Sequence, residues 1–287
     1  MKKIYYITAV FATLFLVGCG DGIDLPGVNV ETDLNKIPLP DNNVNLEQVE
    51  LKPSTEPMLH EGLHTEEDFQ RIRDKKAAGE EPWVSAYQLL VESQFSQKTA
   101  DTYPTEWIKR GISGDENYMN AARGATIVYQ QALRWKIEQD DEYAAKAVEN
   151  LNKWVQTCVG VTGNTNLSLA AGLYGYEFAI AGELLRDYGG WDRADFAAFQ
   201  NWLLKVFYPA NDDFLKRHHD TNALHYWANW CLCNIAAKMA IGIVTDRRDI
   251  YNEGIAHLQT GDTNGRLRRA IYHDYAPDYN FAQWQES

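Results

Sequence analysis

HHDTNALHYWANWCLCNIAAKMAIGIVTD, residues 218–246, is the stretch that decides the fold. Asp220 or Thr221 is a favourable N-cap, and no proline interrupts the residues that follow. The sequence therefore predicts one long helix from Thr221 to Val244. With about 100° between successive residues, this helix is apolar or small on almost every side. That character is typical of a helix buried among other helices.

The polar exceptions gather in the first two turns of this predicted helix. Asn222, His225 and Asn229 are spaced i, i+3 and i+7, which would place them on one helix face. Further along that face, Cys233 and Ala240 are small and leave room for another group. A buried helix with a polar patch at its start suggests the wall of a pocket.

The neighbouring chain repeats one pattern, in which an apolar, small-residue helix is followed by a more charged helix. The predicted pairs are 117–138 with 142–157, 167–187 with 192–207, and 221–244 with 248–259. The second helices begin alike, and Tyr143, Phe196 and Tyr251 recur 53 and 55 residues apart. The repeat predicts an all-α fold of antiparallel helix hairpins, arranged as an α-solenoid or an α/α toroid, and no segment indicates a strand. Because a toroid needs more hairpins to close, we expect an incomplete toroid whose C-terminal part is missing.

The first 57 residues have a different character. Lys2 and Lys3 precede an apolar run that is short for a membrane span, and residues 16–19, LVGC, resemble a bacterial lipoprotein signal. We therefore expect a signal peptide at 1–18, a lipidated Cys19 that anchors the protein to a membrane, and a flexible tether over 19–57. The folded domain would span 58–287. This predicts a protein anchored in the bacterial cell envelope, facing the periplasm or the cell surface.

The charge balance narrows the class of partner. The chain has 287 residues and a net charge of −13, which argues against a general nucleic-acid binder. An anionic substrate stays possible, because a cleft can be locally basic on an acidic protein. Cys231 and Cys233 are two residues apart on one predicted helix and do not face each other, so we expect neither a disulfide nor a zinc site from them.

Several segments together resemble the alginate-lyase-domain family of polysaccharide lyases. The core match is HYWANWCLCN at residues 225–234, supported by 123–135, 170–176, 207–209 and 250–253. The resemblance covers residues 58–287 and implies an α/α-toroid enzyme that cleaves uronic-acid polysaccharides by β-elimination. One departure is Cys231, where the family usually has an acidic residue.

β-Elimination from a uronate removes the weakly acidic C5 proton, so hydrogen-bond donors must stabilise the carboxylate as it gains charge. Asn222 and His225 on adjacent turns suit that task. The resemblance implies a tyrosine as the base that takes the proton and the acid that serves the leaving oxygen. Tyr275 and Tyr279 are the main candidates, with Tyr272 as a third.

Other residues are candidates for substrate binding, each beside a structural alternative. Arg123 and Arg134 would attract carboxylates or form ordinary ion pairs. Asn164 and Asn166 would contact substrate or shape a turn, and Tyr174 would stack on a sugar ring or pack between layers. Asn229 shares the face of the patch, and His219 could reach the same cleft. We expect no metal and no organic cofactor.

Two other functions compete with the lyase. A glycoside hydrolase on a similar scaffold would need two carboxylates across the cleft, for which Glu177, Glu183 and Asp187 are available. A non-catalytic glycan-binding lipoprotein is the second alternative. The predicted patch offers amides and imidazole instead of acids, which favours the lyase.

Overall fold

A computed structural model describes residues 58–60 and 62–272, with the side chains of 268, 271 and 272 outside the description. These residues belong to one compact unit, Glu50–Ser287. The described part is mostly helical, which confirms the all-α class. It opens with α3 (Glu66–Ala77) and α4 (Trp83–Glu92), followed by the short 3-10 helix η2 (Gln94–Ser96). The side chains of Thr65 and Asp68 cap the start of α3 reciprocally.

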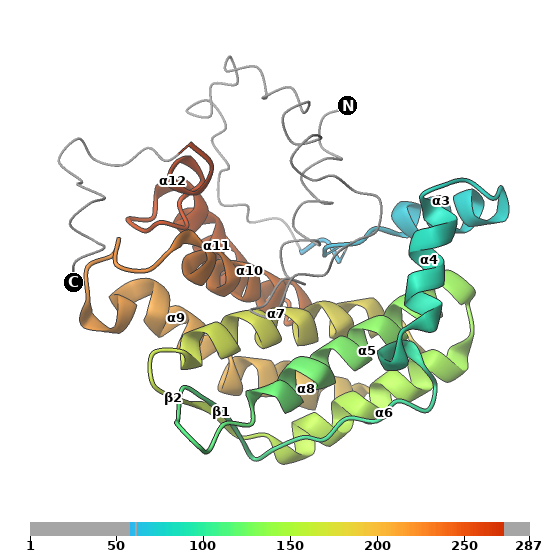
Figure 1. Cartoon of the computed structure of the whole chain (residues 1–287), viewed down its shortest axis with the longest axis horizontal. Helices are drawn as coiled ribbons and strands as arrows, with labels where there is room; N and C mark the ends of the chain where they lie inside the picture. Colours follow the sequence, from blue (N-terminus) through green and yellow to red (C-terminus); the bar gives the residue numbers. More distant parts are fainter. Residues whose placement is uncertain (1–57, 61, 273–287) are drawn as a thin grey trace. The chain divides into compact units, whose positions relative to one another are not determined.

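The three predicted helix pairs are all present (Figure 1). Their bounds are α5 (Tyr118–Glu138) with α6 (Asp141–Thr157), α7 (Leu167–Leu185) with α8 (Arg193–Val206), and α10 (Ala228–Val244) with α11 (Arg248–Thr260); α12 (Leu267–Tyr272) follows. Most bounds agree with the prediction to within two residues. The exception is the start of α10.

The predicted long helix from Thr221 is wrong at its beginning, because α10 starts only at Ala228. The Asn222 side chain accepts a hydrogen bond from the backbone N–H of Leu224, at 2.9 Å, in the local turn that competes with a helix. Asn264 then donates to the carbonyls of Leu224 and Tyr226, which are acceptors that a helix would have used. Residues 221–227 therefore form a link before the helix.

The sequence also missed an extra helix and a small sheet. α9 (Tyr208–Arg217) follows directly after α8, with Pro209 in its first turn, and leads into the 3-10 turn η3 (His218–Asp220). β1 (Trp107–Arg110) and β2 (Gly160–Gly163) pair in parallel, so the absence of strands was a wrong prediction.

The first helices of the three pairs run parallel to one another. Gly172 near the start of α7 lies beside Cys233 of α10, and Arg186 at the end of α7 donates to the carbonyl of Val244, at 2.7 Å. α7 contacts both α5 and α10 (Figure 1). The amino ends of these helices therefore lie on the same side. This order matches the inner layer of an α/α toroid, although closure into a ring stays a prediction.

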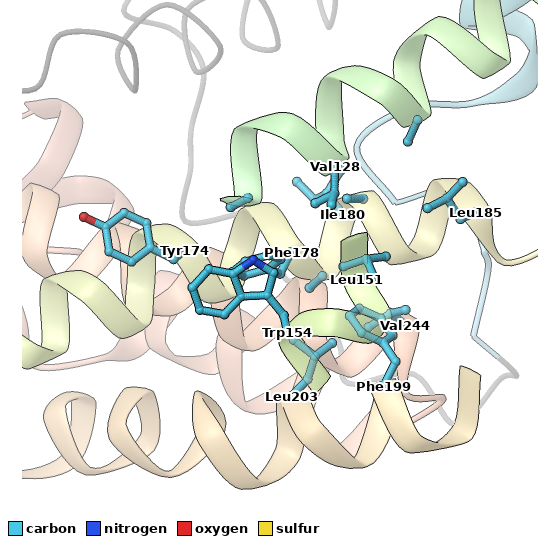
Figure 2. Packing of buried hydrophobic residues seen from close by; sticks show 14 of the residues in the cluster. Val128, Leu151, Trp154, Tyr174, Phe178, Ile180, Leu185, Phe199, Leu203 and Val244 are labelled. Atoms are coloured by element: carbon cyan, nitrogen blue, oxygen red, sulfur yellow. The ribbon is translucent and has the colours of Figure 1, made fainter. Parts of the chain in front are cut away.

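Aromatic side chains fill the space between the first and second helices (Figure 2). Trp154 of α6 and Phe178 of α7 have ring centroids 5.4 Å apart, and Phe178 also meets Trp202 and Phe207. Phe199 of α8 is fully buried in the same cluster. Removing such a ring typically costs about 3–5 kcal/mol, so this cluster fixes the hairpins against one another.

Candidate functional site

The amino ends of α7 and α10 meet at a histidine. His219 Nε2 lies 2.9 Å from the Ser168 hydroxyl at the start of α7, and the imidazole packs edge-on against the Tyr226 ring, with centroids 5.8 Å apart. Burial lowers the pKa of His219 below its usual value, so the imidazole is neutral near pH 7. The sequence predicted that His219 could reach the cleft. The structure fixes it in a defined position beside α7.

The backbone around this histidine is strained. His218, His219 and Asp220 have left-handed φ angles of 47°, 53° and 60°. Such a conformation costs a non-glycine residue about 1–3 kcal/mol and persists only where the surroundings hold it. His218 supplies part of that hold, since it is buried and its Nε2 lies 3.7 Å from Cys231 Sγ. The free thiol of Cys231 is buried, in line with the expectation of no disulfide.

Asn222 and His225 lie in the link before α10, and both are exposed. The predicted shared helix face is therefore wrong, but the two residues still belong to one tight turn. The backbone N–H of His225 donates to the carbonyl of Asn222 at 2.9 Å. The His225 ring packs edge-on against Tyr226, with centroids 4.9 Å apart. The Tyr226 ring therefore contacts the imidazoles of both His219 and His225.

Asn229 and Trp227 flank the same region. Asn229 is exposed in the first turn of α10, two residues after the link. Trp227 is the residue directly before α10, and its side chain is 49% exposed. An exposed tryptophan next to exposed amide and imidazole groups is a suitable surface for a sugar ring.

The sequence missed Arg110, the last residue of β1. Its guanidinium lies over the Tyr118 ring, 4.8 Å from the centroid, at the amino end of α5. Its Nη1 atom is buried and has no hydrogen-bond partner among the residues that the structure describes. An unsatisfied buried donor is uncommon and calls for an explanation, and a carboxylate is the ligand that a guanidinium pairs with best. A four-residue strand gave no sequence pattern that could have identified it.

Arg134 does not belong to this region. It is buried near the carboxyl end of α5, where it pairs with Glu138 and donates to the Tyr143 hydroxyl. It lies about 24 Å along the helix axis from Tyr118. The structure therefore corrects the predicted substrate role in favour of the ion pair. Arg123, five residues into α5, is exposed.

The remaining predicted binding residues are placed as follows. Asn164 Oδ1 accepts from the backbone and side-chain N–H groups of Asn166, both at 2.9 Å, which matches the turn-forming alternative. Tyr174 is 6% exposed, and burial raises its pKa to about 12, so it packs between layers instead of offering a sugar platform. Tyr275 and Tyr279 lie outside the described residues, as does Cys19, and Tyr272 closes α12.

The described residues hold neither a metal-binding cluster nor a membrane-spanning helix. No group of three or more His, Cys, Asp or Glu residues there is placed to hold a metal ion. No helix within 58–60 and 62–272 has the length and apolar character needed to cross a membrane.

The fold and the site define an all-α helix-hairpin protein with imidazole, amide and guanidinium groups near the amino ends of its parallel first helices. A family model described as alginate lyase matches residues 72–270. The chain therefore belongs to the alginate lyase family, which confirms the resemblance seen in the sequence and supports polysaccharide lyase activity in general. Neither a curated protein nor a solved structure matches the chain.

Proposed function

We propose that the protein cleaves alginate or a related uronic-acid polysaccharide by β-elimination. The observation that carries this proposal is the exposed turn of Asn222 and His225, beside the neutral imidazole of His219 and the amino ends of α7 and α10. These groups are hydrogen-bond donors, and helix amino ends favour negative charge. They suit a carboxylate that gains charge during the reaction.

In the proposed reaction, Asn222 and His225 hydrogen-bond the carboxylate of the sugar whose C5 proton is removed. A tyrosine near the C-terminus, Tyr275 or Tyr279 with Tyr272 as the third candidate, takes that proton as base. The C4–O4 bond breaks, its electron pair leaves on O4, and the tyrosine hydroxyl returns a proton to O4. A double bond forms between C4 and C5. No redox partner or cofactor is needed for this balance.

Arg110 is the proposed cation for a substrate carboxylate, in place of Arg134. Two observations support this choice. Its buried Nη1 has no hydrogen-bond partner among the described residues, and its guanidinium lies over the Tyr118 ring. A guanidinium paired with a carboxylate typically contributes about 1.5–3 kcal/mol per charged hydrogen bond.

The hydrolase alternative is weaker because its candidate acids lie along one stretch of chain. Glu177 and Glu183 belong to α7, and Asp187 follows two residues after its end. Glu183 is also engaged by Arg186 at 3.0 Å. A hydrolase needs two carboxylates on opposite sides of the scissile bond.

The test is to incubate the protein with alginate and other polyuronates and to follow the ultraviolet absorbance of a 4,5-unsaturated uronate. His225→Ala and Asn222→Ala should each lower kcat by about 100-fold or more, because each removes a donor to the developing charge. Asn201→Ala, an exposed amide on α8, is the matched control and should leave the rate unchanged. Reducing ends without absorbance would indicate the hydrolase, and glycan binding without either product would indicate the non-catalytic lipoprotein.

Lipid anchoring at Cys19 in the bacterial envelope is a separate part of the proposal, resting on the LVGC sequence at residues 16–19. Metabolic labelling with a radioactive fatty acid should mark the wild type and not Cys19→Ser. Equal labelling of both proteins would contradict the anchor.

A further inference from the structure

The turn between α11 and α12 is hydrogen-bonded to the link that carries His225. Asn264 Nδ2 donates to the carbonyl of Leu224 at 2.9 Å and to that of Tyr226 at 2.6 Å. These two carbonyls belong to the residues on either side of His225. One side chain, about 40 residues further along the chain, therefore holds both ends of the peptide that presents the imidazole.

The part of this turn that contacts the link is buried and packs against α10. Thr263 and Asn264 are 3% and 4% exposed. A Cβ atom on Gly265 would lie 2.5 Å from Cβ of Cys231 in the first turn of α10, so only glycine allows this approach. The turn thus meets the start of α10 as well as the link before it.

The turn is itself fastened to the helices on both sides. Arg266 Nε donates to the carbonyl of Gln259 in α11 at 3.0 Å. Arg269 in α12 pairs with Asp262 at 3.0 Å. The turn can hold the link in place only if the turn is itself held, and these two contacts hold it.

The donor of Asn264, and not its acceptor, makes the contact. Its Oδ1 atom is buried without a hydrogen-bond partner in the described part of the chain, whereas Nδ2 makes two short bonds. Replacing the amide by a carboxylate would remove both donated bonds and set a negative charge against two carbonyl oxygens. The shape of the side chain would hardly change.

We infer that Asn264 is a positioning residue for His225. This inference rests on the proposed function, in which His225 stabilises the charge on the substrate carboxylate. Asn264 touches the backbone of the link and not the substrate, so it acts on the placement of the imidazole. A misplacement of about 1 Å in a catalytic group can cost about 100-fold in rate.

The test compares Asn264→Asp and Asn264→Ala with the wild type. We expect kcat on the polyuronate to fall by about 10- to 100-fold with KM changed by less than about threefold, because binding groups elsewhere are intact. Hydrogen exchange should quicken at the N–H groups of Leu224 and His225, which are bonded to Asn222. Thr260→Ala, at the end of α11, is the matched control and should change neither measurement.

The two readouts separate this inference from the proposed function. A wild type without lyase activity would refute the proposed function, while hydrogen exchange would still test whether Asn264 holds the link in place. Wild-type exchange at the link in both variants, or an unchanged kcat, would overturn the inference. Global unfolding of both variants would also overturn it, since Asn264 would then be a core residue and not a positioning residue.

Discussion

Glu177 provides a sharp prediction, because burial desolvates its carboxyl group and no cation pairs with it in the part of the chain that the structure describes. It lies in the middle of α7, and burial raises its pKa to about 7. The Thr126 side chain on α5 offers a hydrogen bond that opposes this rise in part. Tyr129, Tyr174 and Tyr176 also interact with this carboxyl group, and none of them can neutralise a carboxylate. Glu177→Gln keeps the shape and removes the ionisation.

The sign of the effect follows from the direction of this pKa shift. A folded-state pKa above the ordinary value of 4.5 means that the contribution of Glu177 to stability is fully present below pH 4.5. It is lost as the pH rises from there through about 7. Each pKa unit is worth about 1.4 kcal/mol, so the loss reaches about 3.5 kcal/mol at most. Solvent access to the half-buried side chain lowers the expected value to about 1–3 kcal/mol.

The assay is urea unfolding of both proteins at several pH values. Glu177→Gln should match the wild type at pH 4.5 and exceed its free energy of unfolding by about 1–3 kcal/mol at pH 8. Glu183→Gln is the matched control on the same helix. Because Glu183 pairs with Arg186 and His60, at 3.0 and 3.2 Å, its replacement should destabilise the protein at pH 8. A pH-independent difference for Glu177→Gln, or a loss of stability at pH 8, would refute the reasoning.

Three further predictions concern a buried ion pair, close helix packing and substrate binding. Lys238 is fully buried in α10, and its amino group lies 2.7 and 2.6 Å from two carboxylates. Lys238→Ala should therefore lower the free energy of unfolding by about 2–4 kcal/mol, and Lys238→Met should lower it by less. Equal losses for the two variants in urea titrations would contradict the ion-pair argument. Gly172→Ala would put a Cβ 2.5 Å from the Cys233 sulfur and should cost about 1–3 kcal/mol, whereas Gly189→Ala, with no atom within 4 Å, should cost under about 0.5 kcal/mol in the same titrations. Arg110→Ala should raise KM for a polyuronate about tenfold, and an unchanged KM would remove it from the site.

The helix pairs were predictable because their information is local. Asp140 and Asp192 cap the second helices of the first two pairs, as their positions in the sequence suggest. α9 was missed because Pro209 can end one helix or begin another, and the sequence pattern around it allows both. The β1–β2 pair was missed because four-residue strands are too short for alternation to show.

The sequence could indicate candidate residues for the site, but it could not predict how they are arranged. Asn222 and His225 are neighbours, as expected, yet the reason is a turn and not a helix face. Local spacing favoured a helix through this link. Besides the local Asn222 turn, two hydrogen bonds from Asn264 replace the helix, and a contact between residues about 40 apart leaves no trace in local periodicity. The same holds for Arg110, whose place over Tyr118 depends on the pairing of two distant strands.

The strained backbone at His218–Asp220 and the hydrogen bonds from Asn264 have a common consequence. Left-handed φ at the three successive residues of η3 would relax if this turn were free, so contacts from outside must hold the strained form. Ser168 holds His219 from α7, and Asn264 holds the peptide of His225 from the α11–α12 turn. Both contacts are long-range, so they exist only once the hairpins have packed. The imidazoles are therefore placed by the assembled fold before any ligand arrives, which is the preorganisation that electrostatic stabilisation of a developing charge requires.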